Sequence, residues 1–374
     1  MHLRNLELSN FRNYKSLKLE LKPGLNIFIG KNAQGKTNLL ESIYCLSSGS
    51  SYRTIEKKEA ISWGDEMAIV RGRVKKNNKE SFIEIFFPRK GNKRARVNGS
   101  YLKRIGDLWG NLIVVMFSPQ DLDMVRSSPV YRRQFLDRIL NQINPEYRHH
   151  FERYQRTFNQ RNSLLKLFHL ASNRKKIINT IDLWNRLFVT SGSFIIMERI
   201  KLLEILNNLA KGVIDKIPIN GKLEICYSTS MSVEKKDKIK EIEDEMLRKL
   251  KERQKRDISI GVTTIGPHRD DIKITIGGRD ARNYGSGGQQ RMIALSLKFA
   301  ELNFYNEKLG KKPILLLDEV LSELDENKRR SLLKISQDVE QTIIKSTHYP
   351  QLLKTKKSKI STYLVENGKI KVWQ

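Results

Sequence analysis

Apolar and polar residues alternate near the N-terminus, and a mainly apolar run follows them. Leucines alternate with charged residues over positions 17 to 22, Pro23-Gly24 turns the chain, and an apolar run extends from Leu25 to Ile29. Alternation predicts a half-buried strand, and the continuous run predicts a buried one. After a short segment with glycines, apolar residues recur at helical spacing, at Leu39, Leu40, Ile43 and Leu46. The pattern therefore predicts strand, loop and helix in this order.

The spacing of apolar residues divides the rest of the chain into three parts. Strand-like segments cover residues 67–74, 81–87 and 95–97. From Pro119 the spacing becomes helical, and it predicts helices over 135–143, 147–158, 183–209 and 233–257, with a strand at 223–227. Strands return at 258–262 and 272–276, before a long helix over 289–306. The simplest arrangement is an α/β head formed by residues 1–118 and 257–374, with a mainly helical insertion at 119–256.

The chain is strongly basic. The 374 residues include 70 Lys and Arg against 41 Asp and Glu, which gives a net charge of +29 and a pI near 10.0. Such an excess indicates a polyanionic partner, with nucleic acid as the first candidate. A generally lysine-rich surface is the alternative, because ribosome-binding and membrane-surface proteins share this bias.

Cysteines and apolar runs indicate the compartment. Cys45 and Cys226 are the only cysteines, and each lies within an apolar run. Small buried thiols in a reducing compartment therefore explain them better than a disulfide does. The longest clear apolar runs, such as Leu112 to Phe117, are far below membrane-spanning length. We expect a cytoplasmic protein with no membrane partner.

A phosphate-binding pattern, G-x-x-x-x-G-K-T, lies between the apolar run and the first helix. Its residues are Gly30, Lys31, Asn32, Ala33, Gln34, Gly35, Lys36 and Thr37. Glycines allow backbone N–H groups to face β- and γ-phosphate oxygens, the lysine adds charge, and the threonine hydroxyl can ligate Mg²⁺. The N-terminus of the following helix also favours phosphate. An ordinary glycine-rich turn is the alternative, but the setting of strand, loop and helix favours a bound nucleotide.

A second buried-strand pattern ends in two carboxylates. Residues 313–319 read P-I-L-L-L-D-E. We expect Asp318 to hold Mg²⁺ through water and Glu319 to polarise the water that attacks the γ-phosphate. A core strand that happens to meet an acidic turn is the alternative for this stretch alone.

Three further motifs follow the order of a nucleotide-hydrolysing site. Ser286-Gly287-Gly288-Gln289 opens the last long helix, so a serine hydroxyl and bare N–H groups lie at a positive helix end. Ser322-Glu323-Leu324-Asp325 follows the acidic pair. His348 follows the apolar run that ends at Ile344, which favours a γ-phosphate sensor over an ordinary surface or core histidine.

An aromatic stripe in the helical insertion allows two interpretations. Aromatic residues recur at helical spacing and are interleaved with arginines: Tyr147, Phe151, Tyr154 and Phe158 with Arg148, Arg153, Arg156 and Arg161. Such a stripe can contact DNA, but stripes of this kind are more often a helix core with a solvated back.

The five motifs in this order resemble the ABC ATPase superfamily. The resemblance implies an ABC-type P-loop ATPase head with bound ATP and Mg²⁺, and a two-fold dimer with two ATP molecules in its interface. It implies that Ser286 and Gly288 act on the partner's ATP. By the same resemblance, Gln120, at the junction between head and insertion, is the glutamine that contacts Mg²⁺ and the attacking water. An exposed turn glutamine is the alternative for this residue.

Three further stretches resemble the RecF family within this superfamily. They are L-S-N-F-R-N-Y at residues 8–14, R-R-Q-F-L-D at 132–137 and G-P-H-R-D-D at 266–271, and the resemblance runs from end to end. The stretch from Gln120 to Gly285 is too short for the long antiparallel coiled coil of an SMC-type head. One departure is Glu319, where many family members have a second Asp, and the rate of hydrolysis therefore stays open.

The resemblance implies a recombination mediator that binds DNA in an ATP-dependent way. Its expected partners are gapped or tailed DNA at single-strand to double-strand junctions, RecR, and functionally RecO and RecA. The implied roles are DNA repair, replication-fork maintenance and SOS induction, with slow, DNA-stimulated ATP hydrolysis that opens the dimer. Arg12 and Arg53 have no role that follows from spacing, and both can be ordinary surface arginines.

Three alternatives stay open at the level of the sequence. One is an ATPase subunit of a transporter, which the charge and the arginine-rich insertion oppose. Another is an SMC-like head that processes DNA ends with a separate subunit. The third is a scaffold that binds ATP without hydrolysing it.

Overall fold

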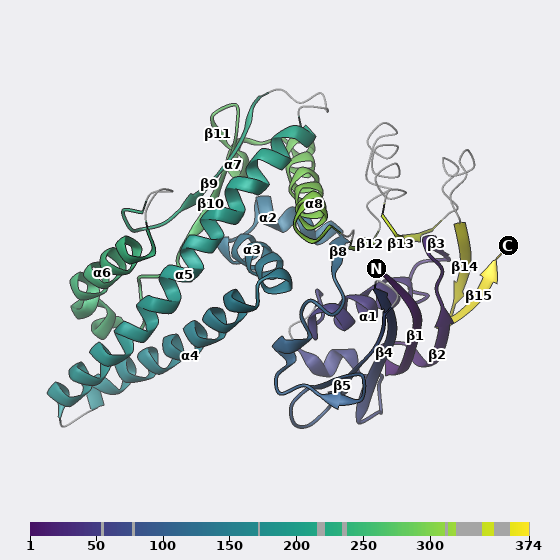
Figure 1. The fold of residues 1–374 in the computed structure, drawn as a ribbon, viewed down its shortest axis with the longest axis horizontal. Helices are drawn as coiled ribbons and strands as arrows, with labels where there is room; N and C mark the ends of the chain where they lie inside the picture. The colour runs from purple at the N-terminus through teal and green to yellow at the C-terminus, as the bar shows by residue number, and fades with distance from the viewer. Residues whose placement is uncertain are drawn as a thin grey trace. The chain divides into compact units, whose positions relative to one another are not determined.

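The chain forms two compact units in a computed structural model (Figure 1). Unit 1 consists of Met1–Asp121 and Glu301–Gln374, and unit 2 consists of Leu122–Ala300. The structure describes residues 1–53, 56–76, 79–170, 173–214, 221–233, 238–310, 313–318, 339–347 and 360–373.

Unit 1 contains an antiparallel sheet with the strand order β2-β1-β4-β5-β6-β7. Its strands are β1 (His2–Phe11), β2 (Tyr14–Glu20), β4 (Met67–Lys76), β5 (Lys79–Pro88), β6 (Arg94–Val97) and β7 (Ser100–Tyr101). Alternate residues of β4 are buried, as expected for a strand with one face on the core, whereas a register shift between Leu3 and Asn5 interrupts the alternation in β1.

A second sheet of unit 1 has the order β15-β14-β3-β13-β12-β8. Its strands are β3 (Gly24–Ile29), β8 (Val114–Phe117), β12 (Ile314–Asp318), β13 (Gln341–Ser346), β14 (Ile360–Glu366) and β15 (Lys369–Trp373). Neighbouring strands from β14 to β8 are parallel, and β15 is antiparallel to β14. Strands β12 and β8 are buried throughout, which explains why their sequences are continuous apolar runs.

Helix α1 (Lys36–Ser48) contacts strands of both sheets and fills the core between them. It begins directly after Gly35 and ends at Gly49, whose φ of 70° is left-handed. The remaining short helices of this unit are η1 (Lys57–Ala60), η2 (Ile105–Leu108) and η3 (Pro119–Leu122), which crosses into unit 2.

Unit 2 is mainly helical. Its helices are α2 (Asp123–Arg126), α3 (Pro129–Ile143), α4 (Pro145–Leu167), η4 (Phe168–Leu170), α5 (Arg174–Ile214), α6 (Ile239–Ile260), α7 (Ala281–Tyr284) and the first part of α8 (Gly287–Leu309). A small antiparallel sheet joins them, with the order β11-β10-β9 and the strands β9 (Leu223–Ser228), β10 (Asp271–Ile276) and β11 (Arg279–Asp280). Helix α5 packs on α3, α4, α6 and β9, so it is the central element of this unit. No helix in the described parts of the chain is long and apolar enough to cross a membrane.

Two buried ion pairs connect the helices of unit 2. Arg161 on α4 is 0% exposed and lies 2.9 Å from Asp257 on α6, which is also 0% exposed. Arg199 on α5 contacts both carboxylate oxygens of Asp137 on α3, at 2.8 and 2.9 Å. Breaking a buried pair of this kind is costly, because the remaining charge has no partner in a poorly solvated site.

The structure revises four expectations from the sequence. Residues 258–262 are not a strand, because Ile258 to Ile260 complete α6 and Gly261 ends it with a φ of 68°. Cys226 is exposed rather than buried, because it lies on the outward face of β9, whereas Cys45 is buried as expected.

The other two revisions concern the helical insertion. Arg161 does not belong to a solvated arginine face, because it is buried. Residues 257–300 pack with unit 2 instead of the head, because β10 pairs with β9 and Asp257 pairs with Arg161.

The aromatic stripe on α4 lies largely in the core of unit 2. Tyr147 and Tyr154 are buried, and Tyr154 stacks on Phe188 of α5 with ring centroids 4.6 Å apart. The stripe therefore joins α4 to α5, and its packing explains the helical spacing without a DNA contact.

His268 is a half-buried histidine whose charge opposes folding. Its Nδ1 lies 2.5 Å from the hydroxyl of Tyr154, and its Nε2 lies 3.0 Å from the carbonyl of Thr263. Burial lowers the pKa of His268 from 6.5 to about 4. Between these pH values the unfolded chain binds a proton that the folded chain does not, so His268 lowers stability as the pH falls from 6.5 toward 4.

We predict that His268→Gln removes this loss. The quantity to compare is the free energy of unfolding of the intact chain minus that of the variant. We expect this difference to be about 2 kcal/mol lower at pH 5 than at pH 7.5. Burial raises the pKa of Asp270 to about 6, which acts in the opposite direction, but both proteins share Asp270 and its effect cancels in the comparison. Urea denaturation at the two pH values measures the difference, and parallel pH profiles would contradict the prediction.

Candidate nucleotide-binding site

The carboxyl ends of the parallel strands β14, β3, β13, β12 and β8 meet at one edge of the second sheet of unit 1. In the register of the sheet, Ser346 pairs with Ile29, Asp318 with Lys345, and Leu317 with Phe117. The phosphate-loop pattern follows Ile29 directly, so the loop and Asp318 lie at the same edge. Ligands of open α/β sheets bind at this end of the strands.

Backbone geometry explains the glycines of the loop. Gly30 has a φ of 159° and Gly35 a φ of 111°. A Cβ atom at Gly30 would lie 2.3 Å from the carbonyl oxygen of Val365, and one at Gly35 would lie 2.6 Å from the side chain of Asn13. Side chains are therefore excluded at both positions by their neighbours and by conformation.

Two turns hold the loop from the side. Asn13, after β1, donates to the carbonyl of Gln34 at 3.2 Å, and Tyr14 donates to the carbonyl of Gly35 at 3.0 Å. Gly368, between β14 and β15, donates its N–H to the same Gln34 carbonyl at 3.1 Å. These contacts occupy the carbonyl oxygens of Gln34 and Gly35. The first N–H groups of α1 have no acceptor within the helix, so they can bind an anion.

Lys36 is buried at the start of α1. Its ammonium donates to the carbonyl oxygens of Gly30 and Lys31, at 2.5 and 2.7 Å. The lysine thus spans the loop from its last residues back to its first ones. It combines a positive charge with a helix N-terminus, and both favour phosphate.

Asp318 and Thr37 share a cationic neighbour. Lys345 on β13 donates to Thr37 Oγ1 at 2.7 Å and lies 2.9 Å from Asp318 Oδ1. Tyr52 donates its hydroxyl to Asp318 Oδ2 at 2.9 Å, and burial raises the pKa of this tyrosine. Asp318 is only 5% exposed, so its carboxylate is held by a phenol and an ammonium from two separate segments.

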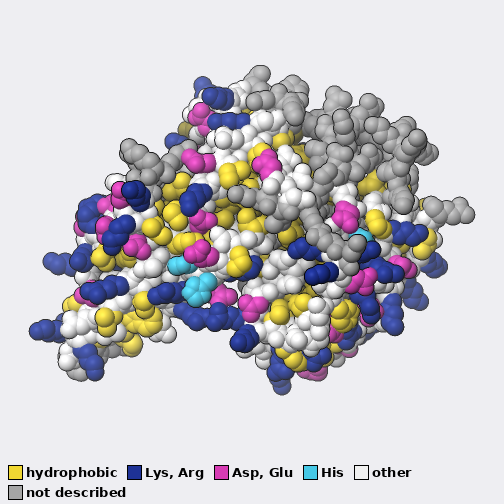
Figure 2. Space-filling view, viewed as in Figure 1, with side chains coloured by type: hydrophobic (Ala, Val, Ile, Leu, Met, Phe, Trp, Pro, Cys, Tyr) yellow, Lys and Arg dark blue, Asp and Glu magenta, His cyan; other side chains and the backbone are white. Residues whose placement is uncertain are grey.

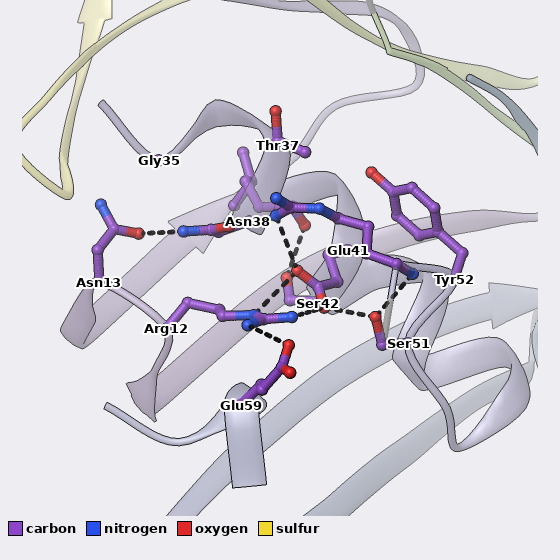
Figure 3. A network of polar contacts seen from close by, with 12 residues as sticks. Arg12, Asn13, Gly35, Thr37, Asn38, Glu41, Ser42, Ser51, Tyr52 and Glu59 are labelled. Atoms are coloured by element: carbon purple, nitrogen blue, oxygen red, sulfur yellow. Dashed lines mark hydrogen bonds and ion pairs between the residues drawn. The ribbon is translucent and has the colours of Figure 1, made fainter. Parts of the chain in front are cut away.

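A buried carboxylate on α1 organises the two arginines whose roles the sequence left open (Figure 3). Glu41 is 0% exposed and accepts two hydrogen bonds from Arg12, at 3.1 and 2.7 Å. It also accepts from the hydroxyl of Ser51 at 2.6 Å and lies 3.4 Å from Arg53, which in turn donates to Asn38 at 2.9 Å. Arg12 and Arg53 are therefore fixed beside α1 rather than being free surface side chains.

The signature motif belongs to unit 2 and caps α8. Ser286 accepts from the N–H of Gln289 at 3.2 Å, and Gln289 accepts from the N–H of Ser286 at 2.9 Å, which forms a capping box. Ser286, Gly287 and Gly288 are exposed. The next residue, Gln290, connects the start of α8 to two other segments. It accepts a hydrogen bond from Arg126 at 2.6 Å and donates one to the carbonyl of Ala281 at 3.0 Å.

Three predicted residues lie outside the described part of the chain. They are Glu319, Asp325 and His348. Gln120 is described, and it is exposed on η3, three residues after the end of β8. Its position at the carboxyl edge of the sheet keeps it on the same side as Asp318.

Oxygen donors at this edge fit the preference of Mg²⁺. Thr37 provides a hydroxyl and Asp318 a carboxylate, and Mg²⁺ is bound by one or two such groups together with phosphates and water. Asp318 Oδ1 is buried, and among the described residues its neighbour is the ammonium of Lys345 at 2.9 Å, in an ion pair without hydrogen-bond geometry. The donor set therefore fits a divalent cation.

Sequence reasoning missed several residues that shape the site. Tyr52, Lys345 and Glu41 carry no motif of their own, and only their contacts reveal them. Asn13 and Tyr14 lie in the stretch that resembles the RecF family. The resemblance singled out this stretch but did not indicate that these two residues contact the loop.

Comparison with known proteins identifies the family. The family model for the RecF/RecN/SMC N terminal domain matches residues 2–371. A curated relative, the DNA replication and repair protein RecF of Clostridium botulinum, is 42% identical over 372 residues, which cover 99% of this chain and 100% of the relative. The chain belongs to the RecF family. RecF of Clostridium tetani is 40% identical, with 98% of this chain and 99% of the relative covered.

Solved structures confirm the fold class. The recombination mediator protein RecF with ATP, in the RecFOR pathway, has a TM-score of 0.92 and 34% identity, with 100% of this chain and 98% of that chain covered. An Smc head domain from Pyrococcus furiosus has a TM-score of 0.54 and 17% identity and shows likeness of fold alone. The predicted ABC-type ATPase head with a helical insertion is thus confirmed, and no long coiled coil is present among the described residues.

Proposed function

We propose that this protein is an ATP-dependent, DNA-binding recombination mediator. The observation that carries the proposal is the phosphate loop, held on both sides by turns, at the same sheet edge as Asp318 and Thr37. Membership of the RecF family, with an ATP-bound relative of the same fold, supports ATP as the nucleotide.

Each residue of the site has a distinct task in this proposal. Loop N–H groups and Lys36 bind the β- and γ-phosphates. Thr37 directly and Asp318 through water would hold Mg²⁺, which would supply further positive charge beside the phosphates. Glu319 accepts a proton from the attacking water, with Gln120 and His348 positioning water and γ-phosphate. Asp325 acts at the nucleotide interface. Slow hydrolysis then serves as a timer for release.

Dimerisation through ATP follows from the exposed signature motif. Ser286 and the N–H groups of Gly287 and Gly288 lie at the N-terminus of α8, where an anion is favoured. We propose that they bind the γ-phosphate of the ATP molecule held by a second copy of this chain. Formation of this ATP-bound dimer would join two basic surfaces, so that the dimer engages more DNA phosphates than a monomer does.

Unpaired basic charge supports DNA as the polyanion. Lys and Arg side chains are spread over the visible surface of both units (Figure 2). On α6 the cations of the first turns are paired with acidic residues, as in the pairs Lys240–Asp244 and Arg248–Glu245. The last turns differ, because their exposed cations have no acidic partner in the described part of the chain: Lys251, Arg253, Lys255 and Arg256. Such cations bind DNA phosphates without reading sequence.

The test is DNA binding and dimerisation with and without ATP. We predict that Ser286→Arg lowers the ATP-dependent gain in affinity for gapped DNA at least about tenfold, because a bulky cation replaces the γ-phosphate ligand. Binding of ATP by the single chain should persist. Light scattering follows the dimer, and fluorescence anisotropy follows the DNA at several salt concentrations.

Ser163→Arg is the matched control, because it adds the same charge at an exposed position of α4. If Ser286→Arg still dimerises with ATP, the signature motif does not act on the partner's nucleotide. Equally tight DNA binding without ATP would mean that basic charge alone explains the affinity. RecR, RecO and RecA are the proposed protein partners, and recruitment of RecR to the DNA-bound dimer tests that step.

A further inference from the structure

Lys345 lies between the two side chains that would hold Mg²⁺. It is the residue of β13 that pairs with Asp318 of β12 on one side and with Phe28 of β3 on the other. Its side chain is 9% exposed, and its ammonium contacts Thr37 Oγ1 at 2.7 Å and Asp318 Oδ1 at 2.9 Å. A single cation of the chain therefore binds both oxygen donors.

A divalent cation and this ammonium compete for the same oxygens. Mg²⁺ binds oxygen at about 2.0–2.1 Å and requires nearly octahedral geometry with water or phosphate in the remaining positions. A lysine within about 3 Å of the same two oxygens occupies part of that coordination sphere and repels the metal as a like charge. Mg²⁺ can be coordinated in the expected way only after the ammonium has moved.

We propose that Lys345 is a resident cation that competes with Mg²⁺ for Thr37 and Asp318. The inference rests on the proposed binding of ATP at this site. It has two consequences: the metal binds more weakly than it would without the lysine, and nucleotide binding depends less on Mg²⁺, because Lys345 itself provides positive charge beside the phosphates.

Tyr52 allows the lysine to leave without disordering the site. Its hydroxyl holds Asp318 Oδ2, the oxygen that does not face Lys345. Asp318 therefore keeps its orientation when Oδ1 exchanges the ammonium for the metal or its water. A purely structural ion pair between β12 and β13 would differ from this competition, because its loss would lower stability and leave the Mg²⁺ dependence unchanged.

The test measures binding of a fluorescent ATP analogue to the full chain, in EDTA and in a Mg²⁺ titration. Lys345→Met removes the charge and keeps the length of the side chain. We expect the Mg²⁺ midpoint of the variant to be about tenfold lower, and its affinity for the analogue in EDTA to be about tenfold weaker. Lys371→Met is the control, since it removes the same charge from an exposed position of β15, and it should change neither value.

The outcomes separate this inference from the proposed function. If the intact chain binds no ATP analogue with or without Mg²⁺, the proposed function fails and the inference fails with it. If the analogue binds but Lys345→Met has the Mg²⁺ midpoint of the intact chain, only the inference is overturned. Lys345→Gln, which keeps a polar side chain, repeats the test should the methionine variant fold poorly, and the same shift is expected.

Discussion

Replacing Lys36 with methionine is expected to weaken ATP binding about 100-fold, because the charge-assisted hydrogen bond of its ammonium to phosphate is lost, a contact worth up to about 3 kcal/mol. Lys36 is 2% exposed and also donates to the carbonyl oxygens of Gly30 and Lys31. Its loss leaves these carbonyls without the ammonium and removes the charge at the start of α1. Calorimetric titration with ATP and Mg²⁺ measures the change, and ATP-dependent DNA binding should disappear with it.

Lys18→Met is the matched control for this prediction. Lys18 lies on β2 and is exposed, so the control removes the same charge outside the site. Circular dichroism of both variants checks that the fold is kept. A Lys36→Met protein that binds ATP as tightly as the intact chain would show that the loop does not hold the phosphates in the proposed way.

Replacing Arg161 with methionine is expected to lower the free energy of unfolding of unit 2 by about 3–5 kcal/mol. Besides its ion pair with Asp257, Arg161 donates to Asn185 at 2.8 Å and to Thr263 at 2.7 Å. It thus joins α4, α5, α6 and the segment that follows α6. Removing the guanidinium leaves the buried carboxylate of Asp257 with the hydrogen bonds from Thr264 as its remaining side-chain contacts among the described residues.

Arg156→Met is the control on the same helix. Arg156 is 65% exposed and forms an (i, i+4) pair with Glu152, a type of contact worth only about 0.3–0.5 kcal/mol. Urea denaturation followed by circular dichroism compares the two variants. If both shift the midpoint equally, the pair between Arg161 and Asp257 does not hold the helices together.

The sequence alone predicts the first of these two effects but not the second. The proposed role of Lys36 is predicted by eight consecutive residues, because a phosphate loop is a local structure whose parts are adjacent in the chain. The role of Arg161 is not predicted in this way, because the sequence presents it as one more arginine on a charged helix. Its partner Asp257 is distant in the chain, and only packing brings the two together.

The same distinction applies to strands and helices. Mainly apolar runs predicted β3 and β12, because a strand buried on both faces needs apolar side chains at most positions. Asn26 and Asp318 are the buried polar residues of these two strands. The predicted strand at 258–262 was wrong, because a short apolar run fits either structure and the charged residues before it extended the helix to Ile260.

By itself the sequence determined the ABC-type fold class and the family, and it predicted the phosphate loop with Lys36 and Thr37, because each rests on local patterns. Only the tertiary structure decided which charges are buried and which segments complete the site. Lys345 joins Thr37 to Asp318, Tyr52 holds Asp318, and Glu41 fixes Arg12. These contacts join residues far apart in the chain, and their energies depend on burial and distance, which a linear pattern does not contain.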